Sequence, residues 1–437
     1  MRRPHGIKAL VLLVAFGLAV GIGGGATYAA FFDTAQNPNN TFEAADDLRP
    51  PVIDDTVIEG GGNVAGSIRA GGTYRVFANV TDLGSPPSGV ASVVADLSNI
   101  TTGAGTTNLS TAGGPWTVDG TSYAWRSAQQ TANGGLASGS VNYSFTLTDN
   151  AGNSGNDGPY SVTVDNAGPS VTATVIQKNE GGVVGFIRQN GSYRVYANLA
   201  DAVGVTSATA NLTNVSGSGA GAVALTTAGG PFSVGGVSYT WRSAAQTASN
   251  PLSAGAKSYS ITAIDTLGNS GTSNTGSVTV DNTVPTGTDF QTTNGGGTAG
   301  KPEAGDTATY SFSEPMEPIS FLAGWDGSST TVTARITQNA SNDRLQVWDS
   351  ANTTQLPFND VALGGNFVNG ATRSFTNSTM VMSGNAITIT LGNPSGPTET
   401  AGAVTPVWTP SANARDRAWN GMSTANVTQV GAPKVNF

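Results

Sequence analysis

The stretch Ser161-Val-Thr-Val-Asp-Asn-Ala-Gly-Pro169 recurs in the chain as Ser277-Val-Thr-Val-Asp-Asn-Thr-Val-Pro285. Its alternating β-branched residues predict a strand with one buried face. The Asp-Asn pair and the proline that follows it end the strand and turn the chain. Because this ending occurs twice, we interpret each copy as the strand that closes one domain before the next begins.

The sequence on either side of these strands is duplicated. Gly72–Asn79 reads GTYRVFAN, and Gly191–Asn198 reads GSYRVYAN, an offset of 119 residues. Further on, Asp149-Asn-Ala-Gly-Asn153 matches Asp265-Thr-Leu-Gly-Asn269 at an offset of 116, because three residues around Ser85–Pro87 are missing from the second copy. This period fits a whole β-sandwich domain and exceeds the length of a solenoid repeat.

The composition favours strands over helices. The chain of 437 residues contains 59 Gly and only 11% charged residues, which predicts short strands joined by turns. Within one expected strand, Tyr143, Phe145 and Leu147 share a face and should point into the core. The predicted fold class is all-β, with tandem β-sandwiches. The strands expected in the first repeat lie at 64–69, 74–80, 90–97, 106–110, 121–127, 141–148 and 160–164.

Both repeats resemble bacterial Ig-like domains, in which a strand ending Asp-x-x-Gly-Asn is followed by a Val-Thr-Val-Asp-x-x-x-Pro strand and a linker. The resemblance covers residues 50–285. Bacterial members of this family lack the disulfide of antibody domains, and Trp125 and Trp241 have no cysteine pair beside them here. The resemblance implies the fold and names no specific ligand.

The last part of the chain is interpreted as a divergent Ig-like β domain. Thr307–Met316, TATYSFSEPM, resembles the TFSEPM strand of another bacterial Ig-like class. Asp416 and Asn420 keep the spacing of the repeated turns, but Trp419 replaces the glycine, which predicts a differently built turn. The full division is a signal peptide at 1–29, a flexible arm at 30–49, Ig-like repeats at 50–166 and 167–285, and the divergent domain at 286–437.

Few residues are available for catalysis. The chain has no cysteine, and its single histidine, His5, lies in the leader. Disulfides, thiolate or histidine zinc sites and histidine-activated nucleophiles are thereby excluded from the exported chain. Carboxylates cluster at Glu303, Glu314 and Glu317, as catalysis by paired acids needs, but the strand-end pattern accounts for the last two. We therefore predict a non-enzymatic protein.

The N-terminus is typical of an export signal. Three basic residues flank the start of a 12-residue apolar run over Ala9–Val20, and Thr27-Tyr-Ala29 offers small residues for cleavage after Ala29. The run is short for a membrane span, which needs about 20 residues. We predict cleavage at this point, and a retained N-terminal anchor is the alternative.

A second resemblance concerns the leader alone. Gly24–Thr34, followed by Asn40-Thr-Phe42, resembles the leader of camelysin/TasA-type biofilm-matrix proteins, which a dedicated signal peptidase releases. The resemblance implies export from a Gram-positive-like cell and makes assembly into a matrix an alternative role.

The charge of the exported chain restricts its partners. Removing residues 1–29 takes away 3 of the 19 basic residues and none of the 28 acidic ones, which leaves 16 − 28 = −12. Such a surface repels nucleic acid and anionic lipid. We expect a secreted or cell-surface protein without a nucleic-acid partner, and without membrane contact after cleavage. The expected partners are a cell-surface or matrix protein, a polysaccharide, or a second copy of the chain.

Side-chain oxygens gather where the domains are expected to meet. Ca²⁺ takes about six to eight oxygen ligands, so these residues are candidates for a calcium site. The alternative is that they cap turns of their own backbone, which the sparse carboxylates favour. We expect no organic cofactor, and Ca²⁺ is the one ion that the pattern supports. The candidate ligands are Asp149, Asn153, Asp165, Asp265, Asn269 and Asp281, with Asp157, Asn166 and Asn282 beside them.

Aromatic residues on the outer face of a strand could bind a glycan. If Tyr74 and Val76 face the core, then Phe77 faces outward, and so does Tyr196 in the second repeat. An exposed ring next to an arginine can stack on a sugar or on a neighbouring chain. The alternative is that an adjacent loop or strand covers both rings.

An isopeptide bond is a further candidate. Some Gram-positive adhesin domains form such bonds, and Lys178, Lys257 and Lys301 are the lysines available for it. No lysine occupies equivalent positions in the two repeats, which argues against this chemistry.

The sequence thus favours an exported string of Ig-like domains that acts in adhesion, spacing or cell-envelope structure. One alternative is a matrix-fibre subunit whose arm, within 30–47, adds a strand to a neighbouring sheet. Another is a carbohydrate-binding module.

Overall fold

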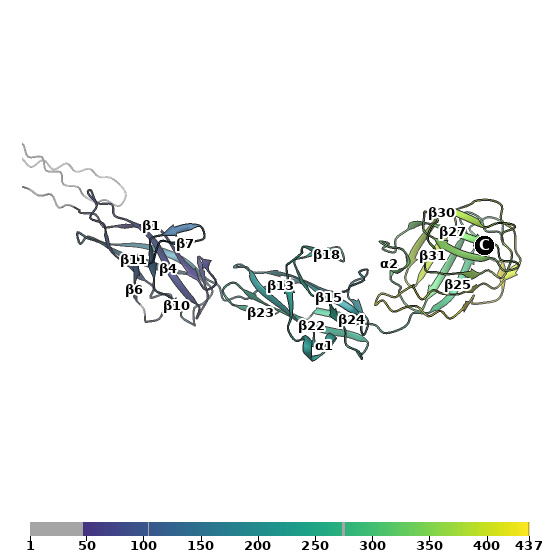
Figure 1. The fold of residues 1–437 in the computed structure, drawn as a ribbon, viewed down its shortest axis with the longest axis horizontal. Helices are drawn as coiled ribbons and strands as arrows, with labels where there is room; N and C mark the ends of the chain where they lie inside the picture. Colours follow the sequence, from purple (N-terminus) through teal and green to yellow (C-terminus); the bar gives the residue numbers. More distant parts are fainter. Residues whose placement is uncertain (1–46, 104, 273–275, 436) are drawn as a thin grey trace, which may run out of the picture.

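Three β-sandwiches follow one another along the longest axis of the molecule (Figure 1). The computed structural model describes residues 47–103, 105–272, 276–435 and 437. The signal peptide, the leader resemblance and nearly all of the proposed arm therefore lie outside the described residues. Among those residues, no helix is long and apolar enough to span a membrane.

The first domain is one continuous ladder that folds back on itself as two layers. Its 10-stranded sheet has the order β2-β1-β4-β9-β6-β5-β11-β12-β3, with β10 paired to β4. Strand β6 pairs with both β9 and β5, so it joins the two layers at one edge. The strands are β1 (Val52–Gly60), β2 (Val64–Ala65), β3 (Ser67–Ile68), β4 (Thr73–Thr81), β5 (Val90–Asp96), β6 (Thr106–Ser110), β7 (Trp116–Val118), β8 (Thr121–Tyr123), β9 (Trp125–Ser127), β10 (Gln130–Thr131), β11 (Gly139–Asp149) and β12 (Ser154–Val164).

The second domain repeats this ladder, as the duplicated sequence predicts. Its 10-stranded sheet has the order β13-β15-β20-β17-β16-β22-β24-β14, with β21 and β23 paired to β15 and β22. Two short helices, α1 (Thr213–Ser216) and η1 (Ser218–Ala220), separate two of its strands. The strands are β13 (Ser170–Lys178), β14 (Phe186–Ile187), β15 (Ser192–Ala200), β16 (Val205–Asn211), β17 (Val223–Thr226), β18 (Phe232–Val234), β19 (Val237–Tyr239), β20 (Trp241–Ser243), β21 (Gln246–Thr247), β22 (Gly255–Asp265), β23 (Ser270–Thr272) and β24 (Gly276–Val280).

The cores of these two domains follow the predicted alternation. In β11, Tyr143, Phe145 and Leu147 are buried between the layers, and their neighbours face outward. Val162 and Val164 at the end of β12 are buried in the same core. The period-two pattern therefore correctly identified the inward-facing residues of these strands.

The third domain is a larger β-sandwich, which confirms the all-β assignment for this part of the chain. Its main sheet is 10-stranded in the order β25-β26-β31-β30-β27-β28-β29-β34-β35, with β32 paired to β30. One short helix, α2 (Pro318–Phe321), follows the TATYSF strand. The strands are β25 (Gly287–Thr293), β26 (Thr307–Phe312), β27 (Thr330–Thr337), β28 (Arg344–Trp348), β29 (Val361–Ala362), β30 (Arg373–Ser383), β31 (Ala386–Thr390), β32 (Asn393–Pro394), β33 (Ala403–Val404), β34 (Val407–Trp408), β35 (Val427–Thr428) and β36 (Lys434–Val435).

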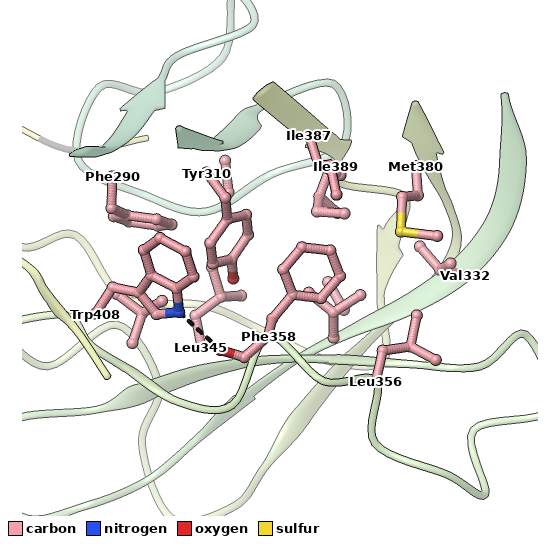
Figure 2. Packing of buried hydrophobic residues seen from close by; sticks show 14 of the residues in the cluster. Phe290, Tyr310, Val332, Leu345, Leu356, Phe358, Met380, Ile387, Ile389 and Trp408 are labelled. Carbon is pink, nitrogen blue, oxygen red and sulfur yellow. Dashed lines mark hydrogen bonds between the residues drawn. The ribbon is translucent and has the colours of Figure 1, made fainter. Parts of the chain in front are cut away.

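Aromatic rings fill the core of the third domain (Figure 2). The Trp408 ring lies edge-on to the Tyr310 ring, with ring centres 5.1 Å apart. Its indole N–H donates a 2.7 Å hydrogen bond to the carbonyl oxygen of Phe358. Trp408 is completely buried, so this bond satisfies the one polar group that the ring carries into the core.

Replacing Trp408 by alanine should destabilise the third domain by about 3–5 kcal/mol, the range for truncating a buried aromatic residue. The loss combines ring contacts, the cavity that remains and the unpaired Phe358 carbonyl. Calorimetric unfolding should show one transition at a lower temperature, with the transitions of the other domains unchanged. Val381→Ala, at a side chain that is 38% exposed, should change the unfolding free energy by less than about 0.5 kcal/mol. Equal effects of the two substitutions would contradict this assignment of the core.

Candidate metal centres at the domain joints

The turn after β11 is closed by one aspartate and one asparagine. The backbone N–H of Asn153 donates to Asp149 Oδ1 at 2.8 Å, and its side-chain amide donates to Asp149 Oδ2 at 2.7 Å. Gly152 has a φ of 91°, in the left-handed region that glycine adopts readily. The asparagine amide also donates to the carbonyl oxygen of Asp47, so this turn holds the chain segment that enters the domain.

The second domain repeats the turn in full. Asn269 donates its backbone N–H and its side-chain amide to the carboxylate of Asp265, at 2.7 and 2.8 Å. The same amide donates to the carbonyl oxygen of Asp165, at the end of the preceding domain. The asparagine therefore bridges the turn and the linker in both repeats.

The third domain builds the same turn, contrary to the expectation drawn from Trp419. Asn420 donates to both carboxylate oxygens of Asp416 at 2.7 Å and to the carbonyl oxygen of Asp281. Trp419 adopts a φ of 75°, so a tryptophan occupies the left-handed position that glycine fills in the repeats. The Arg415 guanidinium lies over its ring, 5.7 Å from the ring centre, and helps to hold this residue in place.

Each turn lies beside two further acids, and together they form an acidic cluster. Within each cluster one oxygen of every carboxylate lies within 4.8 Å of the others. One acid comes from the chain entering the domain, one from the loop after its second long strand, and one from the turn just described. Acidic cluster 1 is Asp47, Asp82 and Asp149, acidic cluster 2 is Asp165, Asp201 and Asp265, and acidic cluster 3 is Asp281, Glu314 and Asp416.

The repeated Asp-Asn pair divides its two side chains between neighbouring domains. Asp165 points forward into acidic cluster 2, whereas Asn166 points back, accepting from the N–H of Ala70 and donating to the carbonyl oxygen of Leu136. Asn282 makes the matching backward contacts with the second domain. The aspartate of each pair also caps its own turn, as the alternative expected, because Asp165 and Asp281 accept the backbone N–H of Ala167 and Thr283, two residues further on. The asparagine instead contacts backbone groups far away in the sequence.

Negative charge in these clusters is incompletely neutralised by the protein. The acid of each turn is at least 98% buried. Asp165 Oδ2 and Glu314 Oε1 are buried atoms without a hydrogen-bond partner. Burial, together with the neighbouring Asp281 carboxylate, raises the pKa of Glu314 to about 7, and burial also raises the pKa of Asp416. In acidic cluster 1, backbone N–H groups of Arg49 and Ser88 lower the pKa of Asp47.

Three converging carboxylates suit a hard cation such as Ca²⁺. Asp165 and Asp281 were predicted as ligands and occupy acidic clusters 2 and 3, and Asp149 and Asp265 occupy clusters 1 and 2. Asn153 and Asn269 lie beside the clusters and direct their amide N–H groups at the turn carboxylate and the linker. Asp157 lies elsewhere, where it accepts from the N–H of Ile53 and the hydroxyl of Tyr160.

Five further acids of the clusters were not predicted as metal ligands from the sequence: Asp47, Asp82, Asp201, Glu314 and Asp416. The internal repeat carried a signal for several of them. Asp47 precedes the first repeat as Asp165 precedes the second, and Asp82 and Asp201 share the offset of 119 residues. Glu314 had no such signal, because the third domain diverges in sequence.

Phe77 and Tyr196 lie on the outer face of their strands, as the alternation predicts, but both rings are covered, as the alternative expected, so the prediction that they are exposed is wrong. Phe77 is 2% exposed and Tyr196 is 9% exposed. The hairpin β7–β8 covers Phe77 with Val118 and Tyr123, and the hairpin β18–β19 covers Tyr196 in the same way. In this conformation neither ring can stack on a sugar.

The three glutamates considered for paired-acid catalysis have separate partners. Glu314 belongs to acidic cluster 3, Glu317 pairs with Lys178, and Glu303 pairs with Lys301. No two of them form a carboxylate pair in the described structure.

Neither a protein-family model nor a curated protein matches this sequence. Three solved structures illustrate its likenesses. Fibronectin(III)-like modules of Clostridium thermocellum CbhA are 15% identical, covering 53% of this chain and 92% of theirs, with a TM-score of 0.21. A putative membrane-anchored protein from Corynebacterium diphtheriae is 12% identical, with coverages of 89% and 97% and a TM-score of 0.22. A bacterial ice-binding adhesin is 14% identical, with coverages of 79% and 98% and a TM-score of 0.27. At these TM-scores the likenesses carry no argument about function.

The raised pKa of Glu314 predicts a pH dependence for the metal-free chain. A carboxyl whose folded pKa is about 7 instead of 4.5 favours the fold when protonated. Its stabilising contribution is complete below about pH 4.5 and is lost as the pH rises through 7. In chelator, the melting temperature of the third domain should therefore fall between pH 5 and pH 8.

Glu314→Gln should flatten this dependence and raise the melting temperature at pH 8, because an amide carries no charge into acidic cluster 3. Asp119→Asn, at an exposed residue of the first domain, should leave the slope unchanged. Identical slopes for the wild-type chain and Glu314→Gln would show that Glu314 does not titrate in this range.

Proposed function

We propose that this chain is an exported, non-enzymatic surface protein whose Ig-like sandwiches act as a spacer, and that Ca²⁺ bound in the acidic clusters stiffens its joints. One observation carries the proposal. A set of three acids recurs at the entrance of all three domains, with Glu314 in place of an aspartate in the third, and one acid of every set belongs to the segment that enters the domain. An ion held by such a set ties the linker to the domain that follows it.

Repulsion between the carboxylates gives the ion its stabilising role. Two like charges about 5 Å apart near a protein surface repel each other by about 3 kcal/mol at an effective dielectric of about 20. A divalent cation replaces this repulsion with attraction, and neutral water or a monovalent ion does so far less well. The buried, unpartnered oxygens of Asp165 and Glu314 are the atoms that gain most from a cation.

A spacer agrees with the other properties of the chain. The expected charge of −12 keeps an extended surface soluble and self-repelling. Each domain has its own hydrophobic core, so the domains are separate mechanical units connected by short segments. Extracellular fluids supply Ca²⁺ at concentrations that weak sites of this kind can use. The expected location at the cell surface or in the matrix therefore suits the proposed role.

Calcium should raise the melting temperature of the exported chain, residues 30–437, and chelator should lower it. Saturating a site at 100 times its Kd stabilises the folded state by about 2.7 kcal/mol. Small-angle scattering on the same samples should show a more uniform, extended particle with Ca²⁺ than with chelator. Mg²⁺ should be less effective, because it requires stricter octahedral geometry.

Variants assign the ions to clusters. Asp82→Asn, Asp201→Asn and Glu314→Gln should each remove about one calcium equivalent in isothermal titration, whereas Asp119→Asn should remove none. If neither the melting temperature nor the scattering profile changed on adding Ca²⁺, the proposal that the ion stiffens the joints would be wrong. Large assemblies that disappear on deleting residues 30–47 would replace the spacer with the fibre alternative.

A further inference from the structure

The two joints between described domains use the same position in different ways. Gly60 is the last residue of β1 and pairs with Tyr74, and Lys178 is the last residue of β13 and pairs with Tyr193. The two tyrosines are equivalent in the repeats, so Gly60 and Lys178 are equivalent too. Each lies at the end of its domain that contacts the next domain.

At the first joint, a leucine packs against this glycine. Leu267 is 5% exposed, yet it is not part of the second domain's core. A Cβ built on Gly60 would lie 2.9 Å from Leu267 Cδ2 and 2.2 Å from the carbonyl oxygen of Ser67. Arg69 completes the contact by donating from Nη1 to the carbonyl oxygen of Gly268 at 3.1 Å. The leucine thus makes this contact apolar, and position 60 has no room for a side chain, because the Ser67 carbonyl of its own domain and the leucine of the next both lie too close.

At the second joint, an ion pair occupies the same place. Lys178 Nζ lies 2.7 Å from Glu317 Oε2, and the two side chains are 2% and 1% exposed. The N–H of Val183 donates to the Glu317 carboxylate, and Lys178 donates a second bond to the carbonyl oxygen of Val183. The charge of each partner is thus matched within the interface. The Asp-to-Asn turn places Ala418 where the second domain has Leu267.

The acid of the second joint has no counterpart at the first. Glu317 lies three residues after Glu314 of acidic cluster 3, and the residue three after Asp201 of acidic cluster 2 is Gly204. The second joint thus gains a lysine on one side and a glutamate on the other, and it loses the leucine. These are compensating changes in two domains, 139 residues apart along the chain.

We propose that these residues form a recognition code that fixes which domain docks on which. Lys178 makes the end of the second domain that contacts the third specific for an acidic partner. Gly60 makes the end of the first domain that contacts the second specific for a leucine. If the third domain docked on the first, Glu317 would be buried without a cation. If a second copy of the second domain docked on Lys178, the lysine would be buried against leucine. A buried charge without its partner is strongly unfavourable, so each wrong pairing is rejected.

Converting the second joint into the first type tests this code. The cysteine-free chain allows nitroxide labels at cysteines placed at the exposed Ala224 and Thr379, which report the distance between the second and third domains. Measured in chelator, so that no ion stiffens the joint, the wild-type chain should give a narrower distance distribution than any variant with a mismatched joint. Lys178→Gly changes one side of the joint, and Glu317→Gly with Ala418→Leu changes the other. Either half-conversion should lose the narrow peak, and all three substitutions together should restore it.

Controls separate recognition from misfolding. Labels at Ser140 and Ala224, across the first joint, should report an unchanged distance in every variant. Glu317→Gln, which keeps the shape of the side chain, should also lose the narrow peak. Glu303→Gln, at a pair that is about one third exposed, should keep it. A narrow peak in either half-conversion, or a triple variant as broad as the halves, would overturn the code.

Discussion

The mutual repulsion of three carboxylates at the entrance of each domain constrains the rest of this structure. Carboxylates that share a space under 5 Å wide either take up a proton, bind a cation or move apart. Moving apart is restricted, because the turn acid is buried and held by an asparagine that also holds the linker. The protein therefore keeps the charges together through the hydrogen bonds of this asparagine. What neutralises them then decides how firmly the linker is attached to the next domain.

The Asp-Asn pair at the end of each closing strand makes this coupling local. Two consecutive residues have different roles. Asn166 bonds to the domain just completed, and Asp165 completes the acidic cluster of the next domain. A movement of Asp165 therefore changes the orientation of the end of β12, the strand that it follows. The asparagine contacts therefore provide a short mechanical path between the two domains, beside the contacts of Gly60 and Arg69 with the second domain.

The sequence was informative where the structure depends on local pattern. Alternation over residues 141–148 correctly placed Tyr143, Phe145 and Leu147 in the core, because one residue in two must face inward in a sandwich strand. The same rule correctly places Phe77 on the outer face of β4, but it does not predict that this ring is buried, since a hairpin some forty residues further along the chain folds over that face. Five of the nine acids in the clusters were likewise missed. They approach one another only through the fold, and Glu314 has no repeat to point to it.

Two kinds of contact therefore act at the joints, and they do different things. The acidic clusters are the same at each domain, so an ion that binds them stiffens every joint without distinguishing one from another. The contacts at Gly60 and Lys178 differ between joints, so they distinguish the correct neighbouring domain from a wrong one without depending on an ion. A chain of tandem domains with similar joints needs both properties, because a general stiffening device alone would stabilise wrong pairings as well as right ones. Separating the two functions lets the clusters stay alike in all three domains while the neighbouring residues diverge.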